Sequence, residues 1–148
     1  MDIDYITKNL IITNKINTLH NINLVKSYTY QPIPIQPIQS YQKTLLFRNE
    51  QFETYQINWN KNAETIIHQH PKNGCIMKVI QGSLQEKLFN SITYPIEQKE
   101  MTNKYEIKNT IYNMNDVSYI DDMIGMHKII ALEDSISLHI YSPPKFYE

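Results

Sequence analysis

The chain has 148 residues, 41% of them hydrophobic and 20% charged, and its formal net charge is −1 at pH 7. This length predicts a single domain with its own core, and the balanced charge argues against a nucleic-acid partner. No apolar run is long enough to span a membrane, no secretory signal follows Met1, and one cysteine excludes an internal disulfide framework, so we expect a cytoplasmic monomer.

The first 35 residues predict a helical segment followed by an extended one. Between residues 1 and 30, apolar residues recur at helical spacing, which predicts one or two short helices. His20 stands there among polar neighbours, and we interpret it as a surface residue. The proline-rich stretch 31–37 cannot be helical and predicts an extended linker. We expect residues 1–35 to form the N-terminal segment of one domain that spans residues 1–148.

The rest of the chain, from residue 41 to residue 144, has the pattern of short strands. Residues 44–48 and 52–59 predict a hairpin with its turn at 49–51, while residues 90–110 are polar and have no clear pattern. The further predicted strands are 65–70, 75–80, 84–89, 111–120 (as one strand or two short pieces), 126–130 and 135–141. Many short strands and few helices predict an all-β fold, a small antiparallel sandwich or barrel.

Two of the five histidines, His68 and His70, are two residues apart in the predicted strand 65–70. On a strand, residues i and i+2 point to the same face, so both imidazoles could aim at one metal ion. The alternative is that an exposed strand carries two polar residues. The chain has three glycines, and Gly74 and Gly125 each lie within a few residues of a histidine. We expect glycine at these positions because the backbone there adopts a geometry that other residues disfavour.

The last two predicted strands carry two more histidines. If they form a hairpin whose loop centres on Glu133, His127 and His139 lie opposite each other on neighbouring strands. Ser137, His139 and Tyr141 alternate with aliphatic residues and so share one face. Alternation leaves two alternatives open, since this polar face can line the interior or face solvent.

Three histidines close in space can bind a divalent metal and leave coordination positions open. Such a site can hold Zn²⁺ and activate water, or hold Fe²⁺ and activate dioxygen, whereas a closed zinc site needs four protein ligands. No acidic residue follows the histidine pair in the stretch 71–74. Three neutral ligands leave the metal its full positive charge, which favours an anionic incoming ligand such as a thiolate.

Four sequence blocks resemble those of the cysteine dioxygenases, a family of thiol dioxygenases in the cupin superfamily. Trp59 stands nine residues before His68, at the position of a tryptophan of that family. The other blocks run in the family's order over residues 68–75 (HQHPKNGC) with 78–86 (KVIQGSLQE), 119–127 (YIDDMIGMH) and 137–144 (SLHIYSPP). The resemblance covers about residues 41–144.

The resemblance implies a cupin barrel that binds Fe²⁺ through His68, His70 and His127. It implies oxidation of L-cysteine by O₂ to cysteine sulfinic acid. In animal-type members of the family a cysteine and a tyrosine near the iron form a thioether, and Cys75 and Tyr141 hold those positions here. His139 matches the residue that hydrogen-bonds that tyrosine.

One departure from the family concerns the substrate. Where the family has Tyr-x-Arg, whose arginine binds the substrate carboxylate, this chain has Tyr41-Gln42-Lys43. Lysine keeps the charge but loses the planar bidentate fork of arginine, and Arg48 is a nearby alternative. Two other functions therefore stay open: oxidation of another small thiol, either a mercapto acid or an aminothiol, and metal binding by a cupin without catalysis.

Overall fold

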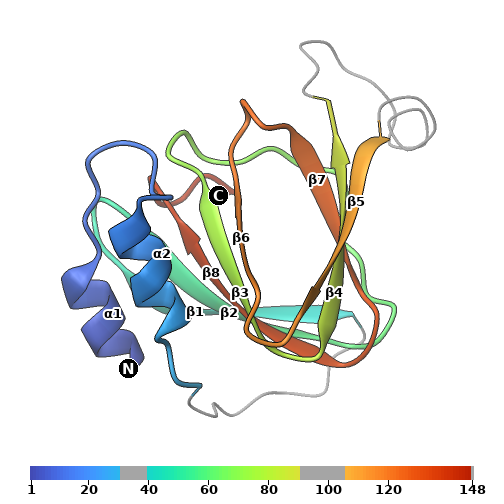
Figure 1. Ribbon diagram of the computed structural model, residues 1–148, viewed down its shortest axis with the longest axis horizontal. Helices are drawn as coiled ribbons and strands as arrows, with labels where there is room; N and C mark the ends of the chain where they lie inside the picture. Colours follow the sequence, from blue (N-terminus) through green and yellow to red (C-terminus); the bar gives the residue numbers. More distant parts are fainter. Residues whose placement is uncertain (31–39, 91–105, 148) are drawn as a thin grey trace.

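The computed structural model describes residues 1–30, 40–90 and 106–147, in which two short helices precede eight strands (Figure 1). The predicted linker 31–37 and most of the unplaced stretch 90–110 lie outside these residues. The helices are α1 (Ile3–Asn9) and α2 (Leu19–Lys26). The strands are β1 (Tyr41–Arg48), β2 (Glu53–Trp59), β3 (Cys75–Gln81), β4 (Ser83–Phe89), β5 (Glu106–Asn113), β6 (Val117–Ile120), β7 (Met126–Ala131) and β8 (Ser135–Tyr141).

The two helices begin at polar caps and bury one apolar face each. Asp2 accepts a hydrogen bond from the amide of Tyr5, and Thr18 accepts one from the amide of Asn21, so each side chain satisfies an otherwise unpaired helical donor. Ile6 of α1 and Val25 of α2 are fully buried. The prediction of short helices between residues 1 and 30 is confirmed, and His20 is exposed as expected.

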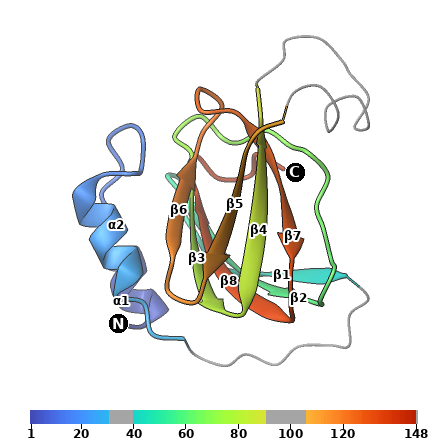
Figure 2. The same cartoon turned by 45° about the vertical axis from the view of Figure 1, so that its right-hand side comes forward.

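The strands form two antiparallel sheets that enclose an interior, as the sequence predicts. One sheet has the order β1-β2-β8-β3-β6, and the other has the order β5-β4-β7. The helices cover the outer face of the larger sheet, so the molecule has a helical layer and two sheet layers (Figure 2). A second cluster of buried residues, which includes Ile57, Val79, Leu84 and Ile129, fills the space between the sheets. The predicted all-β architecture with a helical N-terminal segment is confirmed.

The alternating sequence of β8 is explained by burial on both of its faces. Leu138 and Ile140 pack against the helical layer. Ser137, His139 and Tyr141 point to the opposite face, toward the interior between the sheets, and all three are buried. The polar face of β8 therefore lines the interior, and the solvent alternative is wrong.

The predicted hairpin of the last two strands is wrong. β7 pairs with β4, where His127 lies opposite Leu88, and β8 lies between β2 and β3, where His139 lies opposite Tyr55 and Met77. The short loop after β7 carries the chain from the smaller sheet to the larger one. The amide of Leu132 in this loop donates a hydrogen bond to the carbonyl of Ser83. His127 and His139 thus reach the interior from facing sheets.

Residues 65–70 also differ from the prediction, because they form an extended connection with a bend at Ile67 and no strand. Only isolated bridges tie this stretch to β7. One of them joins His68 to His127 through amide-to-carbonyl bonds of 2.9 and 3.3 Å. Pro71 has no amide hydrogen, so the pairing cannot be extended as a regular ladder beyond that point.

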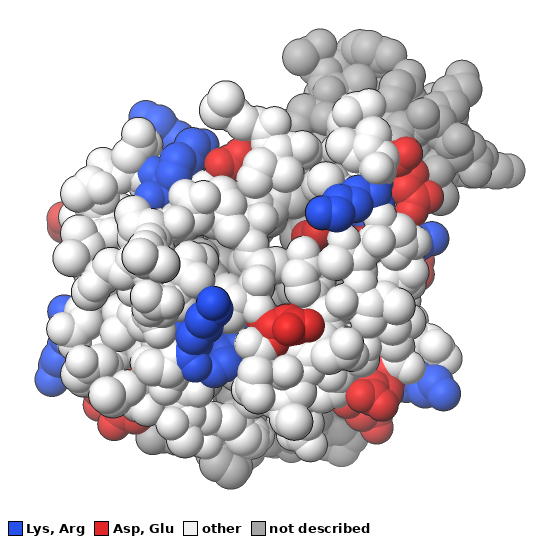
Figure 3. Space-filling view, viewed as in Figure 1, with Lys and Arg blue, Asp and Glu red and all other residues white. Residues whose placement is uncertain are grey.

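On the face seen in Figure 3, no patch consists of charges of one sign, because lysine and arginine side chains are interspersed with acidic ones. Among residues 1–30, 40–90 and 106–147, neither helix is long or apolar enough to cross a membrane.

Candidate metal centre and substrate pocket

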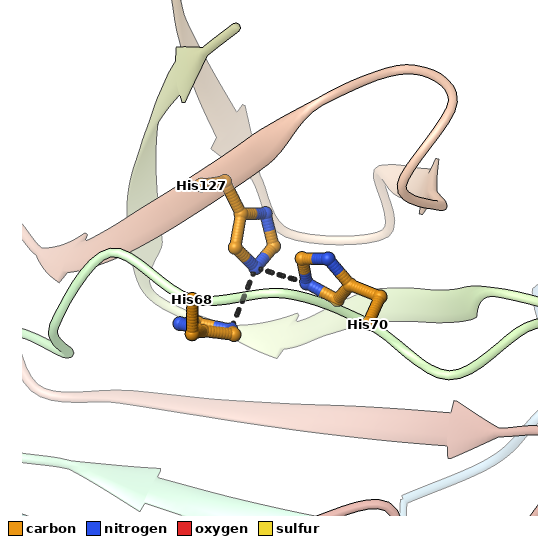
Figure 4. Close-up of side chains that lie close together, drawn as sticks. All are labelled: His68, His70 and His127. Carbon is orange, nitrogen blue, oxygen red and sulfur yellow. Dashed lines mark hydrogen bonds between the residues drawn. The ribbon is translucent and has the colours of Figure 1, made fainter. Parts of the chain in front are cut away.

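Three histidines converge at one point inside the barrel (Figure 4). His68 and His70 come from the extended connection before β3, and His127 comes from β7 in the smaller sheet. The Nε2 atom of His127 lies 3.1 Å from Nε2 of His68 and 3.0 Å from Nε2 of His70. The three residues lie together, as the sequence predicts. His68 and His70 do so from an extended connection, although a strand was expected there.

For His68 and His127, a hydrogen bond to the other ring nitrogen fixes which nitrogen the ring offers. Nδ1 of His68 donates to the carbonyl of Ile66 at 2.8 Å, and Nδ1 of His127 donates to the carboxylate of Glu86 at 2.8 Å. A neutral imidazole with its proton on Nδ1 has a bare lone pair on Nε2. Two bare nitrogens therefore face each other at 3.1 Å, an arrangement that a cation between them stabilises.

Burial keeps these rings in the form that binds a metal. Desolvation lowers the pKa of His68, His70 and His127 below the ordinary value of 6.5, and repulsion from neighbouring histidines adds to the effect for His70 and His127. A neutral imidazole is the form that ligates metals. Desolvation likewise raises the pKa of Glu86, opposed by its hydrogen bond from Tyr112.

The spacing of the nitrogens fits a shared divalent ion. Two nitrogens that are each about 2.1 Å from a metal and about 90° apart lie about 3.0 Å from each other. The ligand atoms of His68, His70 and His127 all lie within 4.8 Å of one another. Imidazole ligands suit Fe²⁺ and Zn²⁺ alike, and a three-histidine set leaves coordination positions open on the pocket side.

A cavity of about 250 Å³ opens beside the histidines. Its walls are mainly apolar, and they include Ile57, Trp59, Met77 and Ile129. Among the lining residues that the structure describes, none is acidic and Lys43 is the one lysine or arginine. A small anionic ligand is therefore the kind that this lining can accept beside a metal ion.

Lys43 reaches this cavity from β1, at a register position opposite Ile57. Its ammonium lies 4.4 Å from the ring centroid of Tyr55 and 4.9 Å from those of Tyr141 and Tyr147. Desolvation lowers the pKa of Lys43, and the nearby Cys75 and Glu53 counteract that shift. Tyr41, the other predicted substrate residue, lines the cavity and packs on Trp59 with a centroid distance of 5.0 Å.

Arg48, the alternative to Lys43, does not line the cavity. Its guanidinium forms an ion pair of 2.7 Å with buried Glu53 and donates to the hydroxyl of Tyr55 at 3.0 Å. Arg48 therefore neutralises a buried carboxylate and positions a tyrosine under Lys43, so Lys43 is the cation that faces the cavity.

A chain of hydrogen bonds links the remaining predicted site residues. The indole of Trp59 donates to Ser137 Oγ at 2.9 Å, and Ser137 Oγ lies 2.7 Å from Nε2 of His139. The hydroxyl of Tyr141 lies 3.3 Å from Nδ1 of the same histidine. Desolvation drives the pKa of His139 well below 6.5, so the ring is neutral, and one of its nitrogens donates a hydrogen bond while the other accepts one.

Cys75 and Tyr141 are direct partners across β3 and β8. The sulfur of Cys75 also lies 4.0 Å from Nδ1 of His139. Burial raises the pKa of the Cys75 thiol to about 12 and that of the Tyr141 hydroxyl well above 10.0, so both stay protonated at neutral pH.

Comparison with known proteins agrees with this geometry. The profile of one family, cysteine dioxygenase type I, matches residues 3–147. The chain belongs to the cysteine dioxygenase type I family. Human cysteine dioxygenase type 1 is 34% identical over 100 residues, which are 65% of this chain and 47% of the human protein. The zebrafish (Danio rerio) protein of the same name is 27% identical over 141 residues, 89% of this chain and 68% of that protein. The chain thus spans about half the length of the human relative.

Solved structures show the cupin fold that the sequence predicts. The structure of KdgF from Halomonas sp. superposes with a TM-score of 0.57 at 18% identity, over 76% of this chain and 87% of that one. An RmlC-like cupin from Shewanella frigidimarina gives a TM-score of 0.54 at 14% identity, over 73% and 80% of the two chains. This cysteine dioxygenase family member therefore has the cupin fold.

Sequence reasoning missed three residues of the site. Glu86 interrupts the buried face of β4 between Leu84 and Leu88, and a charged residue in an apolar alternation is a signal that could have identified it. Ser137 was placed on the same face as His139, but its hydrogen bond to that ring was not predicted. Tyr147 had no such signal, because it lies after the last strand and reaches the cavity through a non-repeating segment.

Proposed function

We propose that this chain is a thiol dioxygenase that holds Fe²⁺ through His68, His70 and His127 and oxidises L-cysteine to cysteine sulfinic acid. The observation that supports it best is the convergence of three neutral histidines, one lysine and three tyrosines on a single cavity of a cysteine dioxygenase family member. The reaction is RSH + O₂ → RSO₂H, in which sulfur loses four electrons and dioxygen gains them.

The bound iron would supply a Lewis acid for the thiolate and a route for electrons to dioxygen. The protein supplies the geometry. Ile66 and Glu86 hold the rings of His68 and His127 with Nε2 toward the metal, which is the usual work of hydrogen bonds to the outer nitrogen of a ligand. The apolar walls exclude water, which strengthens charge interactions inside the cavity.

Lys43 and Tyr41 would bind the substrate carboxylate. The Lys43 ammonium is held over three tyrosine rings and has no acidic neighbour among the described lining residues, so it can meet an anion. This lining favours thiols that carry a carboxylate. It does not favour an aminothiol, since a second cation would face Lys43.

Tyr141 would accept a hydrogen bond from the substrate thiol and so hold its proton near the reacting sulfur. Its hydroxyl points at Nδ1 of His139, and that ring is held in turn by Ser137 and Trp59. The hydroxyl oxygen can still accept a hydrogen bond from the substrate thiol. The chain from Trp59 to Tyr141 therefore fixes where that proton lies when sulfur approaches the metal.

Cys75 and Tyr141 would form the thioether as a side reaction of oxygen activation. A bond forms between Sγ and a ring carbon, the thiol and the ring each lose one hydrogen, and O₂ is reduced to H₂O₂ by the two electrons and two protons released. The pairing of the two residues across β3 and β8 supports this step. Intact mass should show a loss of two hydrogens after turnover, and Cys75→Ser should abolish that loss.

Oxygen uptake tests the proposed function. Protein loaded with Fe²⁺ under nitrogen should consume one O₂ per sulfinate formed from L-cysteine, with sulfinate measured by mass spectrometry. Protein loaded with Zn²⁺ is the matched control, since it fills the site without redox chemistry. Iron-loaded protein that produces no sulfinate from L-cysteine, 3-mercaptopropionate or cysteamine would overturn the proposal.

A further inference from the structure

The segment after β8 crosses the histidine-bearing connection and is anchored at both of its ends. At its start, Ser142 donates its hydroxyl to the carbonyl of Gln51 at 2.7 Å and accepts from the side chain of Asn73 at 3.1 Å. At its end, the hydroxyl of Tyr147 donates to the carbonyl of Gln69 at 2.8 Å. Gln69 is the residue between His68 and His70, so this segment is fastened directly to the candidate metal centre.

Tyr147 contacts each functional part of the site with its ring. The ring stands edge-on to His68 at 5.9 Å and edge-on to Tyr141 at 5.4 Å. The ammonium of Lys43 lies 4.9 Å from its centroid. Tyr147 also lines the cavity while 41% of its surface remains exposed, so the residue stands between the cavity and solvent.

We propose that Tyr147 is a specificity-determining residue, whose ring closes the cavity mouth and fixes Lys43 to bind the carboxylate of a small thiol acid. This inference rests on the proposed function. It assigns the choice of substrate to a residue outside the barrel strands.

A lysine in this position needs external support. The ammonium is a point charge on a flexible stem, whereas the planar fork of an arginine is preorganised for a carboxylate. Rings of Tyr55, Tyr141 and Tyr147 surround the ammonium at 4.4 to 4.9 Å, within the range of cation–π attraction. Glu53 is already ion-paired with Arg48, so it acts on Lys43 only through longer-range attraction. Tyr147 is the member of this set that comes from outside the sheet, and its removal both frees the ammonium and opens the mouth.

The substrate class follows from these contacts. A thiol with a carboxylate should bind well, and a thiol without one, such as cysteamine, should bind poorly. A thiol acid with extra bulk beside the sulfur, such as penicillamine, should be excluded by the ring of Tyr147.

Three variants test the role of Tyr147 in the holoprotein. Tyr147→Ala removes the ring, and Tyr147→Phe keeps the ring but loses the hydrogen bond to Gln69. Tyr5→Ala is the matched control, because Tyr5 lies on α1 and is exposed to a similar extent, 44%. Binding is measured under nitrogen by fluorescence of Trp59, the only tryptophan of the chain, which lines the cavity. Turnover is measured separately as KM and kcat for the same thiols.

Tyr147→Ala should weaken binding of L-cysteine and 3-mercaptopropionate by about threefold to tenfold, the cost of ordering the freed Lys43 side chain on binding, and should leave cysteamine unchanged. The same variant should gain binding of penicillamine. Tyr147→Phe should restore the discrimination between substrates, and Tyr5→Ala should match the unsubstituted protein.

Two results would overturn the inference. One is equal weakening of cysteamine and the thiol acids in Tyr147→Ala, and the other is continued exclusion of penicillamine by that variant. These binding measurements need no turnover, so a protein that binds thiol acids as described but forms no sulfinate would refute the proposed function and leave the role of Tyr147 intact.

Discussion

The candidate metal centre, called the metal centre below, and the helical layer both bury polar groups, but they differ in whether these groups have hydrogen-bond partners. In the helical layer, Asn21 is fully buried and donates to the carbonyls of Ile11 and Ile16 at 2.9 and 3.1 Å, while it accepts from the amide of Ile11. Lys78 is 3% exposed, and its ammonium donates to the carbonyls of Lys26 and Tyr28 at 2.7 and 3.0 Å. The polar atoms of both side chains thus have partners within the protein.

The metal centre leaves polar atoms without such partners. Nδ1 of His70 is buried with no hydrogen-bond partner in the described part of the chain, and the nearest carboxylate oxygen, on Asp122, is 3.9 Å away. The Nε2 lone pairs of His68 and His127 face each other. Buried polar groups are nearly always paired in folded proteins. Gln42 Oε1 and Thr54 Oγ1 are also buried without a hydrogen-bond partner in the described part of the chain, so an unpaired atom by itself does not mark the site. The feature that distinguishes it is the pair of facing Nε2 lone pairs on His68 and His127, which a bound cation would stabilise.

Substitution of His70 by leucine should have the largest effect on turnover and little effect on the stability of the fold. His70→Leu should lower turnover with iron and L-cysteine by more than about 100-fold. This exceeds the loss expected for a residue that only hydrogen-bonds a metal ligand. The metal-free protein should keep its free energy of unfolding within about 1 kcal/mol, because an apolar side chain replaces a buried nitrogen that lacks a partner. Urea unfolding and oxygen uptake measure both effects. A large loss of metal-free stability would show that His70 supports the fold.

Glu86→Gln tests the carboxylate that orients His127. The amide still accepts from Nδ1 but carries no charge, so affinity for Fe²⁺ or Co²⁺ should fall by about 10- to 100-fold. Calorimetric titration of metal into the metal-free protein measures this change. Lys87→Gln is the control, since it neutralises the next residue on β4, which does not line the cavity. An unchanged affinity in Glu86→Gln would remove Glu86 from the metal centre.

The sequence predicted the elements of the fold better than their pairing. Strand periodicity and helical spacing depend on local burial, and they placed β2, β3, β4 and β8 within a few residues. The pairing of β7 with β4 depends on a loop that changes sheets, and no local pattern records that change. Symmetry about Glu133 therefore suggested a hairpin that the chain does not form.

The candidate site was predictable where it follows motifs and unpredictable where it depends on packing. His68, His70, His127, Cys75 and Tyr141 stand in family blocks, and the structure brings them together at one cavity. Gly74 was also expected to meet a backbone requirement. It has a φ of +93°, and a Cβ there would lie 2.4 Å from the hydroxyl of Tyr119. Tyr147 and the tyrosine rings around Lys43 come together only through tertiary packing, which spacing along the chain does not encode.

Lys78→Met tests the helical layer and should leave the metal centre unaffected. The variant loses two hydrogen bonds from a charged donor, those to the carbonyls of Lys26 and Tyr28. The free energy of unfolding should fall by about 2 kcal/mol, a typical value for bonds of this kind. Metal affinity should not change, because Lys78 points to the helical side of β3 and its neighbours Met77 and Val79 point to the interior. Weakened metal binding would show that the two regions are coupled.

Acid should destabilise the protein through the site, and His139→Gln should reduce that sensitivity. Burial holds the pKa of His139 well below 6.5, so the folded protein leaves this ring neutral while the unfolded chain protonates it. Stability therefore falls as the pH drops below 6.5, since the unfolded state binds the extra proton. Between pH 7.5 and pH 5.5, one such histidine lowers the free energy of unfolding by about 1.4 kcal/mol.

Urea unfolding of the metal-free protein at several pH values should show a fall in stability that is smaller by this amount in His139→Gln. His20→Gln, which alters an exposed ring of the helical layer, is the control. Equal pH dependence in His139→Gln and the unsubstituted protein would show that His139 is not held neutral by the fold.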